Sequence, residues 1–493
     1  MGRACSPKNR TAIGMSIKTN SQVRVRFAPS PTGHLHIGGL RAALFNWLFA
    51  RHHQGIFCVR IEDTDVARSL PEYTESILDS LRWCALQPDE PLLIQSSRFP
   101  EHKQALDQLL VQGKAYRCYC TAEEIAARQG NISDTISAFA GYDRFCRTRT
   151  DKPSGDFGIR FAIPIDRKSI IFDDLIRGRV EFSTDQLDDF IIARSDGYPL
   201  YNFVVVQDDA YMQITHIIRG EEHLSNTPRQ ILLYEAFNYE IPIFAHVPLI
   251  LGPDGNKLSK RDAATAVLDY KRAGYLPDAL INYLVRLGWS HGDQEIFTKQ
   301  ELIAYFDLDH VGKKGAIFDK EKLDWVNSIY IRALAPEALY DYIIAHLEPK
   351  LADLLAPWDK EKIIASIALY QDRIKTIGEL LSILYRLRIV PHVYDEHDVA
   401  TWITPQALEH LELLMTRLET LDQYDADQIN MVLKQMCKEF NIKLVALAQP
   451  VRLALVGTTA SPSIFALMAL LGKQESLQRL SLLVDLVTRS KAN

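Results

Sequence analysis

The sequence predicts an α/β fold with a parallel sheet, interrupted by an α+β insertion and followed by an all-α C-terminal region. Three observations predict it. Strand and helix patterns alternate from residue 23 to about residue 99. Between residues 114 and 200, aromatic residues, arginines and short strand-like runs replace that alternation. From about residue 333 onward, almost every segment has apolar residues at helical spacing.

The first predicted strand, residues 23–27, ends in a loop suited to phosphate. Two prolines and Gly33 break the strand, and a helix is predicted to begin near Ile37. Gly55 suits the left-handed position after that helix. N–H groups and the helix dipole attract anions where a strand turns into a helix. Gly38 and its neighbour Gly39 lack side chains, so a flat ring such as adenine can approach the backbone closely.

The following elements are predicted in chain order. Residues 56–61 form a second buried strand, and the α/β pattern returns at residues 201–206 and 214–218. A turn at residues 252–256, GPDGN, then leads into KLSKR, whose lysines and arginine can neutralise a polyphosphate. Helices are predicted beyond this turn, at residues 268–273, 280–287, 363–370 and 464–471.

Composition limits the class of protein. The chain has 493 residues, enough for roughly three or four domains, and no apolar run long enough for a bilayer. Residues 1–20 carry four basic residues but lack the apolar core of a secretory signal, so we expect a disordered extension, or an early start codon before Met15, in preference to a targeting leader. Seven cysteines in a chain this long fit a reducing compartment, and we expect a cytoplasmic monomer. The net charge of −6 does not by itself indicate nucleic acid.

Two segments identify a family. PSPTGHLHIGG at residues 29–39 and KLSKR at residues 257–261 resemble the HIGH and KMSKS signatures of class I aminoacyl-tRNA synthetases. Gly39 stands where the first signature has its last histidine, and glutamyl-tRNA synthetases usually lack that histidine. RFAPSPTG, RIEDTD, RGEEHLSNTPRQ and FDKEKLDWVN also resemble the glutamyl-tRNA synthetase pattern. The resemblance runs from about residue 23 to the C-terminus and is bacterial in type.

The resemblance implies a domain order. It implies a Rossmann-like catalytic domain in two halves, an insertion that grips the acceptor end of tRNA, a helical stem-contact domain, and a helical anticodon-binding region of two subdomains. The corresponding residues are 21–113 and 201–262 for the halves, 114–200 for the insertion, 263–332 for the stem-contact domain and 333–493 for the anticodon-binding region.

The implied reaction activates L-glutamate with ATP and Mg²⁺ and transfers it to tRNA(Glu). A carboxylate with a pKa of about 4 is already ionised, so alignment and charge cancellation matter more than a general base. We expect His36 and Lys260 to be the main stabilisers, with Lys257 secondary. The resemblance implies an ATP site formed by Pro29, Ser30, Thr32, Gly33, His36, Gly38, Gly39, Lys257, Leu258, Ser259, Lys260 and Arg261.

By resemblance, glutamate is bound by Arg26, Ser30, Glu62, Tyr201 and Arg219. A guanidinium can hold a carboxylate in bidentate fashion, which suits the two arginines to the side chain of glutamate. Glu62 suits the substrate ammonium. Its alternative is an exposed ion pair with Arg60 or Arg68.

The sequence leaves two interpretations for a group of three cysteines and one tyrosine. Cys118, Cys120 and Cys146, with Tyr142, resemble the structural zinc site of some family members, and three thiolates plus one further ligand can hold zinc. Buried free thiols are the other interpretation.

Three other functions remain open. The chain can be a non-discriminating synthetase that also charges tRNA(Gln). It can be a tRNA-binding paralogue without catalysis, although such relatives usually have broken phosphate loops. A nucleotidyltransferase acting on a small molecule shares the first loop but does not explain the helical end.

Overall fold

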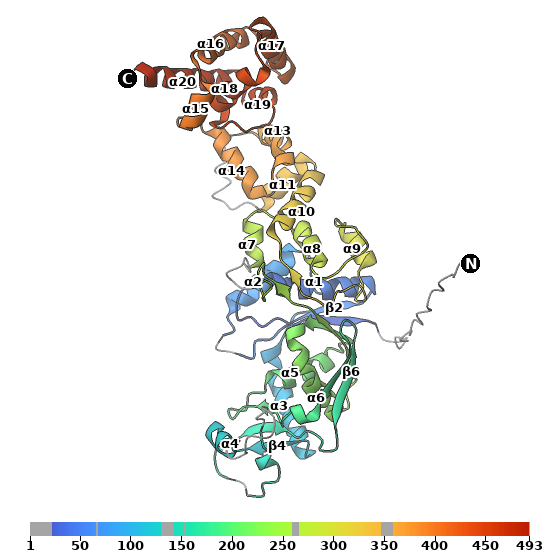
Figure 1. Ribbon diagram of the computed structural model, residues 1–493. Helices are drawn as coiled ribbons and strands as arrows, with labels where there is room; N and C mark the ends of the chain where they lie inside the picture. The colour runs from blue at the N-terminus through green and yellow to red at the C-terminus, as the bar shows by residue number, and fades with distance from the viewer. Residues whose placement is uncertain are drawn as a thin grey trace, which may run out of the picture. The chain divides into compact units, whose positions relative to one another are not determined.

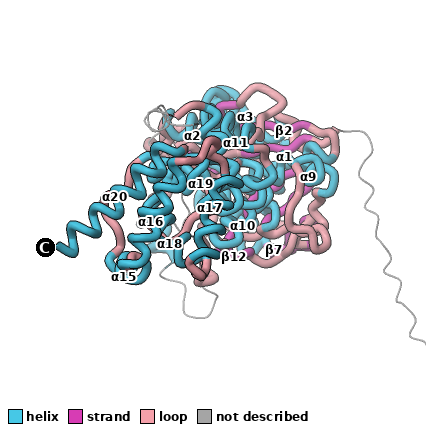
Figure 2. The backbone as a smooth tube through the Cα atoms, turned by 90° about the horizontal axis from the view of Figure 1, so that it is seen from above, coloured by secondary structure: helices cyan, strands magenta, loops and turns pink. Residues whose placement is uncertain are grey.

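The computed structural model describes residues 22–65, 68–129, 142–151, 153–258, 266–346 and 358–492. The chain divides into two compact units: Met1–Leu268 with Ile281–Phe318, and Asp269–Leu280 with Asp319–Asn493 (Figure 1). Every strand among the described residues belongs to the first unit, and the second unit is helical (Figure 2). The extension predicted at residues 1–20 lies outside the described residues.

The first half of the catalytic sheet is parallel, in the order β1-β2-β3. Strands β1 and β2 are mostly buried, as expected for strands covered on both faces, and their buried residues include the charged Arg26 and Arg60. The predicted strand at residues 56–61 and the helix start at Ile37 are confirmed. The elements of this half are β1 (Arg24–Phe27), α1 (Ile37–His52), β2 (Ile56–Ile61), α2 (Pro71–Trp83), β3 (Leu93–Ile94) and α3 (Phe99–Val111).

The second half forms a sheet in the order β7-β6-β10-β9. Its parallel strands β9 and β10 pair along their whole length, and β6 runs parallel to β10. The two halves meet where the Thr215 N–H donates to the Arg24 carbonyl at 3.0 Å, so β1 and β9 begin side by side. The elements are α5 (Tyr201–Tyr211), β9 (His216–Gly220), α6 (Thr227–Phe237), β10 (Ile243–Val247), β6 (Ser169–Asp174) and β7 (Gly178–Ser183).

The structure differs from the predicted insertion at residues 114–200. Only part of it forms a sheet of its own, with β5 antiparallel to β4 and β8. The β6–β7 hairpin instead joins the catalytic sheet, because its apolar face is buried there: Ile170 is fully buried, and the Phe172 ring lies 5.7 Å from that of Phe244 in β10. The separate elements are β4 (Ala115–Cys118), α4 (Ala122–Gln129), β5 (Gly158–Phe161) and β8 (Ile191–Ala193).

The boundary predicted at residues 262/263 also differs, since residues 281–318 belong to the first unit. Aromatic packing explains this: the Phe306 ring lies 5.1 Å from Phe45 of α1 and 5.8 Å from Trp289. This part of the chain contains β11 (Ile250–Leu251), α7 (Val267–Arg272), α8 (Pro277–Arg286), α9 (Lys299–Tyr305) and β12 (Ala316–Ile317).

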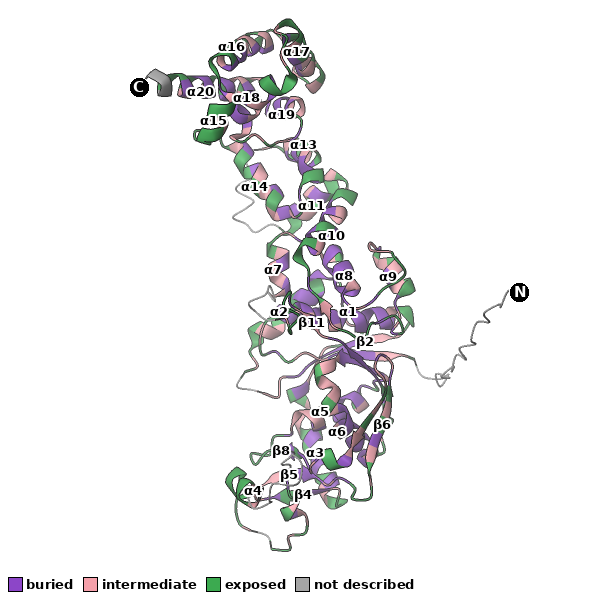
Figure 3. Ribbon diagram, viewed as in Figure 1, coloured by how far each residue is buried: buried purple, intermediate pink, exposed green. Residues whose placement is uncertain are grey.

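The second unit confirms the predicted all-α region. Several helices begin at side-chain caps, including Asp319, Asp359 and Thr404, whose oxygens accept backbone N–H groups of the first turn. Buried residues line the facing sides of these helices (Figure 3). The helices are α10 (Lys320–Ala333), α11 (Pro336–His346), α13 (Lys360–Tyr370), α14 (Ile377–Arg388), α15 (Glu396–Trp402), α16 (Pro405–Glu419), α17 (Ala426–Glu439), α18 (Leu444–Val456), α19 (Ile464–Leu471) and α20 (Lys473–Ala492).

In the described parts of both units, no helix combines the length and apolar character needed to cross a bilayer.

The end of α1 corrects one prediction. Gln54, with φ of 52°, takes the left-handed position that was predicted for Gly55. Gly55 is required for another reason: a Cβ atom added there would lie 2.3 Å from the Val23 carbonyl oxygen. The glycine therefore allows the chain to pass close to the start of β1 before it enters β2.

Candidate active site

The loop after β1 ends at a helix N-terminus whose cap is a histidine. His36 has extended backbone, and its Nδ1 accepts the Gly39 N–H at 3.1 Å. In the neutral imidazole the hydrogen is therefore on Nε2. The remaining first-turn N–H groups and the helix dipole favour an anion at this end of α1. The exposed side chain of His36 adds a hydrogen-bond donor to the same place.

The two glycines of α1 make room for the His36 cap and for Leu35. A Cβ at Gly38 would lie 3.0 Å from the His36 Nδ1, and one at Gly39 would lie 2.7 Å from Leu35 Cδ1. Side chains at these positions would therefore displace the imidazole or the leucine beneath it.

The rest of the loop lies against the end of β2. The Pro29 carbonyl accepts the Glu62 N–H at 2.9 Å, and the Ser30 carbonyl accepts the Thr32 N–H at 2.9 Å. Ser30 and Thr32 are exposed, whereas Pro29 and Gly33 are half-buried. The loop thus turns outward at the carboxyl edge of the sheet, between β1 and β2.

The residues on either side of the second predicted segment are partly described. Lys257, which is exposed, pairs with Leu251, and the Leu258 N–H donates to the Ile250 carbonyl at 3.1 Å. Ser259, Lys260 and Arg261 lie outside the described residues. The chain is described again at Ala266, which forms an antiparallel bridge with His36. The residues that flank this segment therefore connect β11 with the N-terminal cap of α1.

A buried cluster of charges lies at the same edge of the sheet. Asp209 Oδ1 accepts Arg26 Nε at 3.1 Å and Arg60 Nη1 at 2.6 Å, and Glu62 Oε1 accepts Arg60 Nη2 at 2.9 Å. The predicted alternative of an exposed Glu62 pair is wrong in exposure, because Glu62 is 6% exposed, but right in naming Arg60. Arg68 instead pairs with Asp65.

Burial and pairing act in opposite directions on these groups. Burial raises the pKa of Glu62 above its usual value, although Arg60 opposes the shift. Burial also disfavours the Asp209 carboxylate, but Arg26 and Arg60 outweigh it and hold the Asp209 pKa below its usual value. Asp209 therefore stays ionised between the two guanidinium groups.

Arg219 belongs to the same cluster and lies within β9, which extends beyond the run predicted at residues 214–218. Its charge, with those of Arg26 and Glu62, acts on the Tyr201 hydroxyl, and burial raises the Tyr201 pKa to about 12. The Tyr201 hydroxyl lies 3.1 Å from Nδ1 of His223. Burial and the Arg219 charge lower the pKa of His223 to about 4, so this imidazole is neutral at pH 7.

The charges of this cluster do not cancel. Arg26, Arg60 and Arg219 bring three positive charges, and Glu62 and Asp209 bring two negative charges, so one positive charge is in excess. Among the described residues, none accepts a hydrogen bond from the Nη groups of Arg26. An anionic ligand is therefore favoured here.

Several residues of the cluster were not predicted as site residues. Arg60 had a sequence signal, since it is the one charged residue of the apolar segment IFCVRI. Asp209 had a weaker signal, because Asp208 and Asp209 follow the apolar run at residues 203–206. A buried charge beside such a run needs a partner.

The cysteine cluster lies in the separate insertion sheet. The ligand atoms of Cys118, Cys120 and Cys146 all lie within 4.8 Å of one another. The Tyr142 hydroxyl lies 3.3 Å from Cys118 Sγ and 3.7 Å from Cys120 Sγ. Burial opposes a thiolate, but hydrogen bonds from Tyr142 and its neighbours lower the Cys146 pKa to about 7. Three sulfurs and one oxygen around a common point fit tetrahedral zinc.

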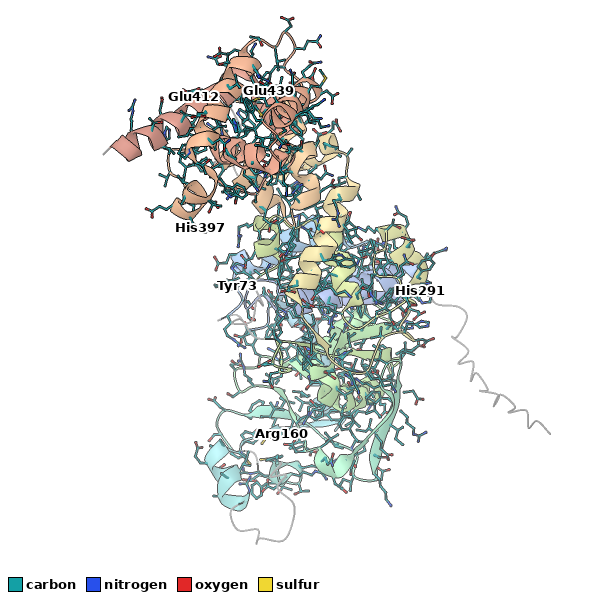
Figure 4. All side chains as sticks on the ribbon, turned by 45° about the horizontal axis from the view of Figure 1, so that its top comes forward. Tyr73, Arg160, His291, His397, Glu412 and Glu439 are labelled. Atoms are coloured by element: carbon teal, nitrogen blue, oxygen red, sulfur yellow. The ribbon has the colours of Figure 1, made fainter. Side chains whose placement is uncertain are left out.

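Arg160 supports this cluster from β5. The carbon atom of its guanidinium group lies 3.7 Å from the centre of the Tyr142 ring. Figure 4 labels Arg160 in the first unit. A second arginine, Arg128, donates to Cys120 Sγ at 3.2 Å. Both arginines favour negative charge on the cluster.

Comparison with known proteins identifies the family. Residues 22–325 match the family described as tRNA synthetases class I (E and Q), catalytic domain, and residues 350–484 match an anticodon binding domain. The glutamate–tRNA ligase of Geotalea uraniireducens (strain Rf4) is 46% identical, over 95% of this chain and 100% of that protein. The chain belongs to the glutamate–tRNA ligase family of class I tRNA synthetases. The predicted family and fold class are confirmed.

Two other members of the glutamate–tRNA ligase family are also similar to this chain over most of its length. The enzyme of Thermodesulfovibrio yellowstonii is 44% identical, over 94% of this chain and 99% of that protein. The crystal structure of a glutamate tRNA ligase from Elizabethkingia meningosepticum, in complex with its amino acid, has a TM-score of 0.83 at 33% identity and covers 94% of this chain and 99% of that one.

The first prediction concerns the charge balance of the buried arginine cluster. Replacing Asp209→Asn removes one of two carboxylates that stabilise three buried guanidinium groups. We expect a loss of about 3–5 kcal/mol of unfolding free energy, as for other broken buried ion pairs. Thermal and urea unfolding at pH 7 measure it.

The matched control is Glu75→Gln, which removes one partner of an exposed pair with Arg82 in the same unit. This variant is expected to change stability by less than about 1 kcal/mol. Equal, small effects of both substitutions would contradict the proposed dependence of the buried cluster on Asp209.

Proposed function

We propose that this chain activates L-glutamate with ATP and Mg²⁺ and transfers the glutamyl group to the 3′ end of tRNA(Glu). The observation that carries the proposal is the excess positive charge of the buried arginine cluster, beside a helix N-terminus capped by His36. A substrate with an additional carboxylate complements that charge. The phosphates of ATP complement the helix N-terminus.

The first step joins the glutamate α-carboxylate to the α-phosphorus of ATP. A carboxylate oxygen forms the new P–O bond, and the bond to pyrophosphate breaks. No general base is needed, because the nucleophile is already ionised. His36 and Lys260 stabilise the charge that develops on phosphate, and Lys257 assists. Mg²⁺ enters with ATP and is bound mainly by its phosphates.

The remaining ATP site combines backbone groups of both loops. Gly38 offers its backbone N–H group, and both Gly38 and Gly39, whose own N–H is bonded to His36, leave an open surface for the adenine ring. The other proposed members of the site are Pro29, Ser30, Thr32, Gly33, Leu258, Ser259 and Arg261.

In the amino-acid pocket, Arg26 and Arg219 face the side-chain carboxylate, and Tyr201 adds a hydroxyl. Glutamine would leave the excess charge poorly paired, at a cost of about 1.5–3 kcal/mol for each lost charged hydrogen bond. Glu62 and Ser30 hold the substrate ammonium, and the raised pKa of Glu62 falls when a cation arrives.

The second step passes the glutamyl group to a ribose hydroxyl, and AMP leaves. The insertion sheet β4-β5-β8 and the helical unit supply the surfaces for the acceptor end and the anticodon of tRNA. We propose that the enzyme acts as a cytoplasmic monomer.

The second prediction separates this function from a non-discriminating synthetase. We expect the purified protein to charge tRNA(Glu) and to leave tRNA(Gln) almost uncharged, because the anticodon-binding region distinguishes them. Charging with [³H]glutamate and each purified tRNA measures it. Equal acceptance would establish the non-discriminating function instead, and no charging of either tRNA would favour a non-catalytic paralogue.

The third prediction concerns Lys260. The Lys260→Ala variant is expected to lower glutamate-dependent ATP–pyrophosphate exchange by about 10²–10³-fold, because a charge that stabilises the transition state is lost. Its affinity for tRNA should stay within about twofold of the wild type by filter binding. The control is Lys103→Ala, an exposed lysine of α3, which should leave both quantities unchanged. Parallel loss of exchange and tRNA binding would contradict the assigned role.

We also propose structural zinc at Cys118, Cys120, Cys146 and Tyr142. When bound, zinc supplies a crosslink between the end of β4 and the short helix Phe145–Arg147. The low pKa of Cys146 and the nearby arginines suit thiolate ligands.

The fourth prediction tests the metal. Protein purified without chelator is expected to contain about one equivalent of zinc by inductively coupled plasma mass spectrometry, and Cys146→Ser should abolish it. The control Cys437→Ser removes a cysteine outside the cluster and should keep the metal. Wild-type protein without zinc, with all three thiols reactive toward a thiol reagent, would establish free cysteines.

A further inference from the structure

The Arg219 guanidinium is held on nearly all sides by the protein itself. It donates from Nη1 to Gln230 Oε1 at 2.8 Å, from Nη2 to Thr227 Oγ1 at 2.9 Å, and from Nε to His246 Nε2 at 3.1 Å. A weaker contact joins Nη2 to the His223 carbonyl at 3.4 Å. Because most of its N–H groups are already bonded, the orientation of this side chain depends on these partners.

The contact with His246 fixes the tautomer of that histidine. Arginine has no acceptor, so Nε2 of His246 must carry a lone pair when it receives the Arg219 Nε–H. The hydrogen of the imidazole is then on Nδ1, which lies 2.6 Å from Asp174 Oδ2. His246 and Asp174 are both fully buried at this contact. The three side chains thus form a chain of directed hydrogen bonds from β6 through β10 to β9.

Asp174 is oriented by the backbone of its own hairpin. Its Oδ1 accepts the N–H of Ile176 at 3.0 Å and of Arg177 at 2.8 Å, and Oδ2 accepts the backbone N–H of His246 at 3.1 Å. Each of these neighbours therefore donates a hydrogen bond to Asp174. Only a side chain that accepts on both oxygens can satisfy all of them. Burial opposes its charge, but hydrogen bonds from His246 and the backbone hold the Asp174 pKa below its usual value.

We propose that Asp174 and His246 are positioning residues for Arg219, and that through it they set the affinity of the pocket for the carboxylate of the amino-acid side chain. This inference rests on the proposed role of Arg219 in glutamate binding. The pair assigns a function to the β6–β7 hairpin, which the sequence predicted as part of a separate insertion. Asp174 and His246 touch no substrate in this arrangement and are not catalytic residues.

Asparagine at position 174 tests this role at an almost constant side-chain volume. Its Oδ1 must face the Ile176 and Arg177 N–H groups, so its NH₂ group faces both Nδ1 and the backbone N–H of His246. The imidazole must then accept at Nδ1 and carry its hydrogen on Nε2, opposite the Arg219 Nε–H. The Nε2–H can donate instead to Thr227 Oγ1 at 3.2 Å, so Arg219 loses its bond to His246.

The fifth prediction follows from this geometry. Asp174→Asn and His246→Phe are each expected to raise the KM for glutamate about 10- to 100-fold, the effect of one lost charged hydrogen bond. Their kcat and their KM for ATP should stay within about threefold of the wild type. His246→Gln restores an acceptor near the position of Nε2 and is expected to recover most of the glutamate affinity. Steady-state tRNA charging measures all three parameters.

Two further variants make the outcome decisive. His102→Phe breaks another buried His–Asp pair in the same unit, at 2.7 Å from Asp208, and should lower the melting temperature without changing the KM for glutamate. Arg219→Ala tests the pocket itself. If Arg219→Ala leaves the KM for glutamate unchanged, the proposed role of Arg219 is wrong. If it raises this KM while Asp174→Asn and His246→Phe do not, only the positioning role is overturned.

Folding is checked in parallel by circular dichroism and thermal melting. If Asp174→Asn does not fold, His246→Phe can still be compared with His246→Gln, because both variants keep Asp174 and replace only the imidazole. Equal KM values in these two variants would overturn the proposal, and recovery in the glutamine variant alone would support it.

Discussion

The site depends on one constraint: guanidinium groups are buried beside too few carboxylates. Arg60 is fully buried and is stabilised only because Asp209 and Glu62 lie within 2.6 and 2.9 Å. Arg26 shares Asp209 with it, so one carboxylate oxygen serves two cations. Burying a charge without a partner costs several kcal/mol. This excess of positive charge is the reason for proposing an anionic ligand, which would complete the balance when it binds.

The sheet topology explains how these charges meet. Strand order reverses between β1 and β9, and ligands of open α/β sheets bind outside the carboxyl ends of strands at such a point. Arg26 and Arg219 come from the two strands on either side of it. The His36 cap ends the loop that follows β1, so the proposed phosphate and carboxylate sites share one edge of the sheet. The hairpin strand β6 extends the same sheet and brings Asp174 to the far side of Arg219.

Much of this arrangement follows from sequence, because its signals are local. Helix α1, strand β2 and the helical third have periodic patterns, and the loop residues Pro29 and His36 stand at a strand-to-helix turn. What sequence did not predict depends on contacts between distant segments. Gly55 is set by the approach of Val23, and the hairpin joins the sheet through Phe172 and Phe244. No local pattern carries such information.

In the proposed amino-acid pocket, the two arginines would contribute to recognition in different ways. Arg219 has bonds to Gln230, Thr227 and His246, so it contributes a fixed charge with little freedom to adapt. Arg26 is held only through Nε, and its Nη groups have no acceptor among the described residues, so they are the donors that a carboxylate can take in bidentate fashion. A neutral amide presents one oxygen and one NH₂ group to this pair of cations. The NH₂ group would face a donor, and the excess charge would stay uncompensated, so discrimination against it arises from geometry and charge together.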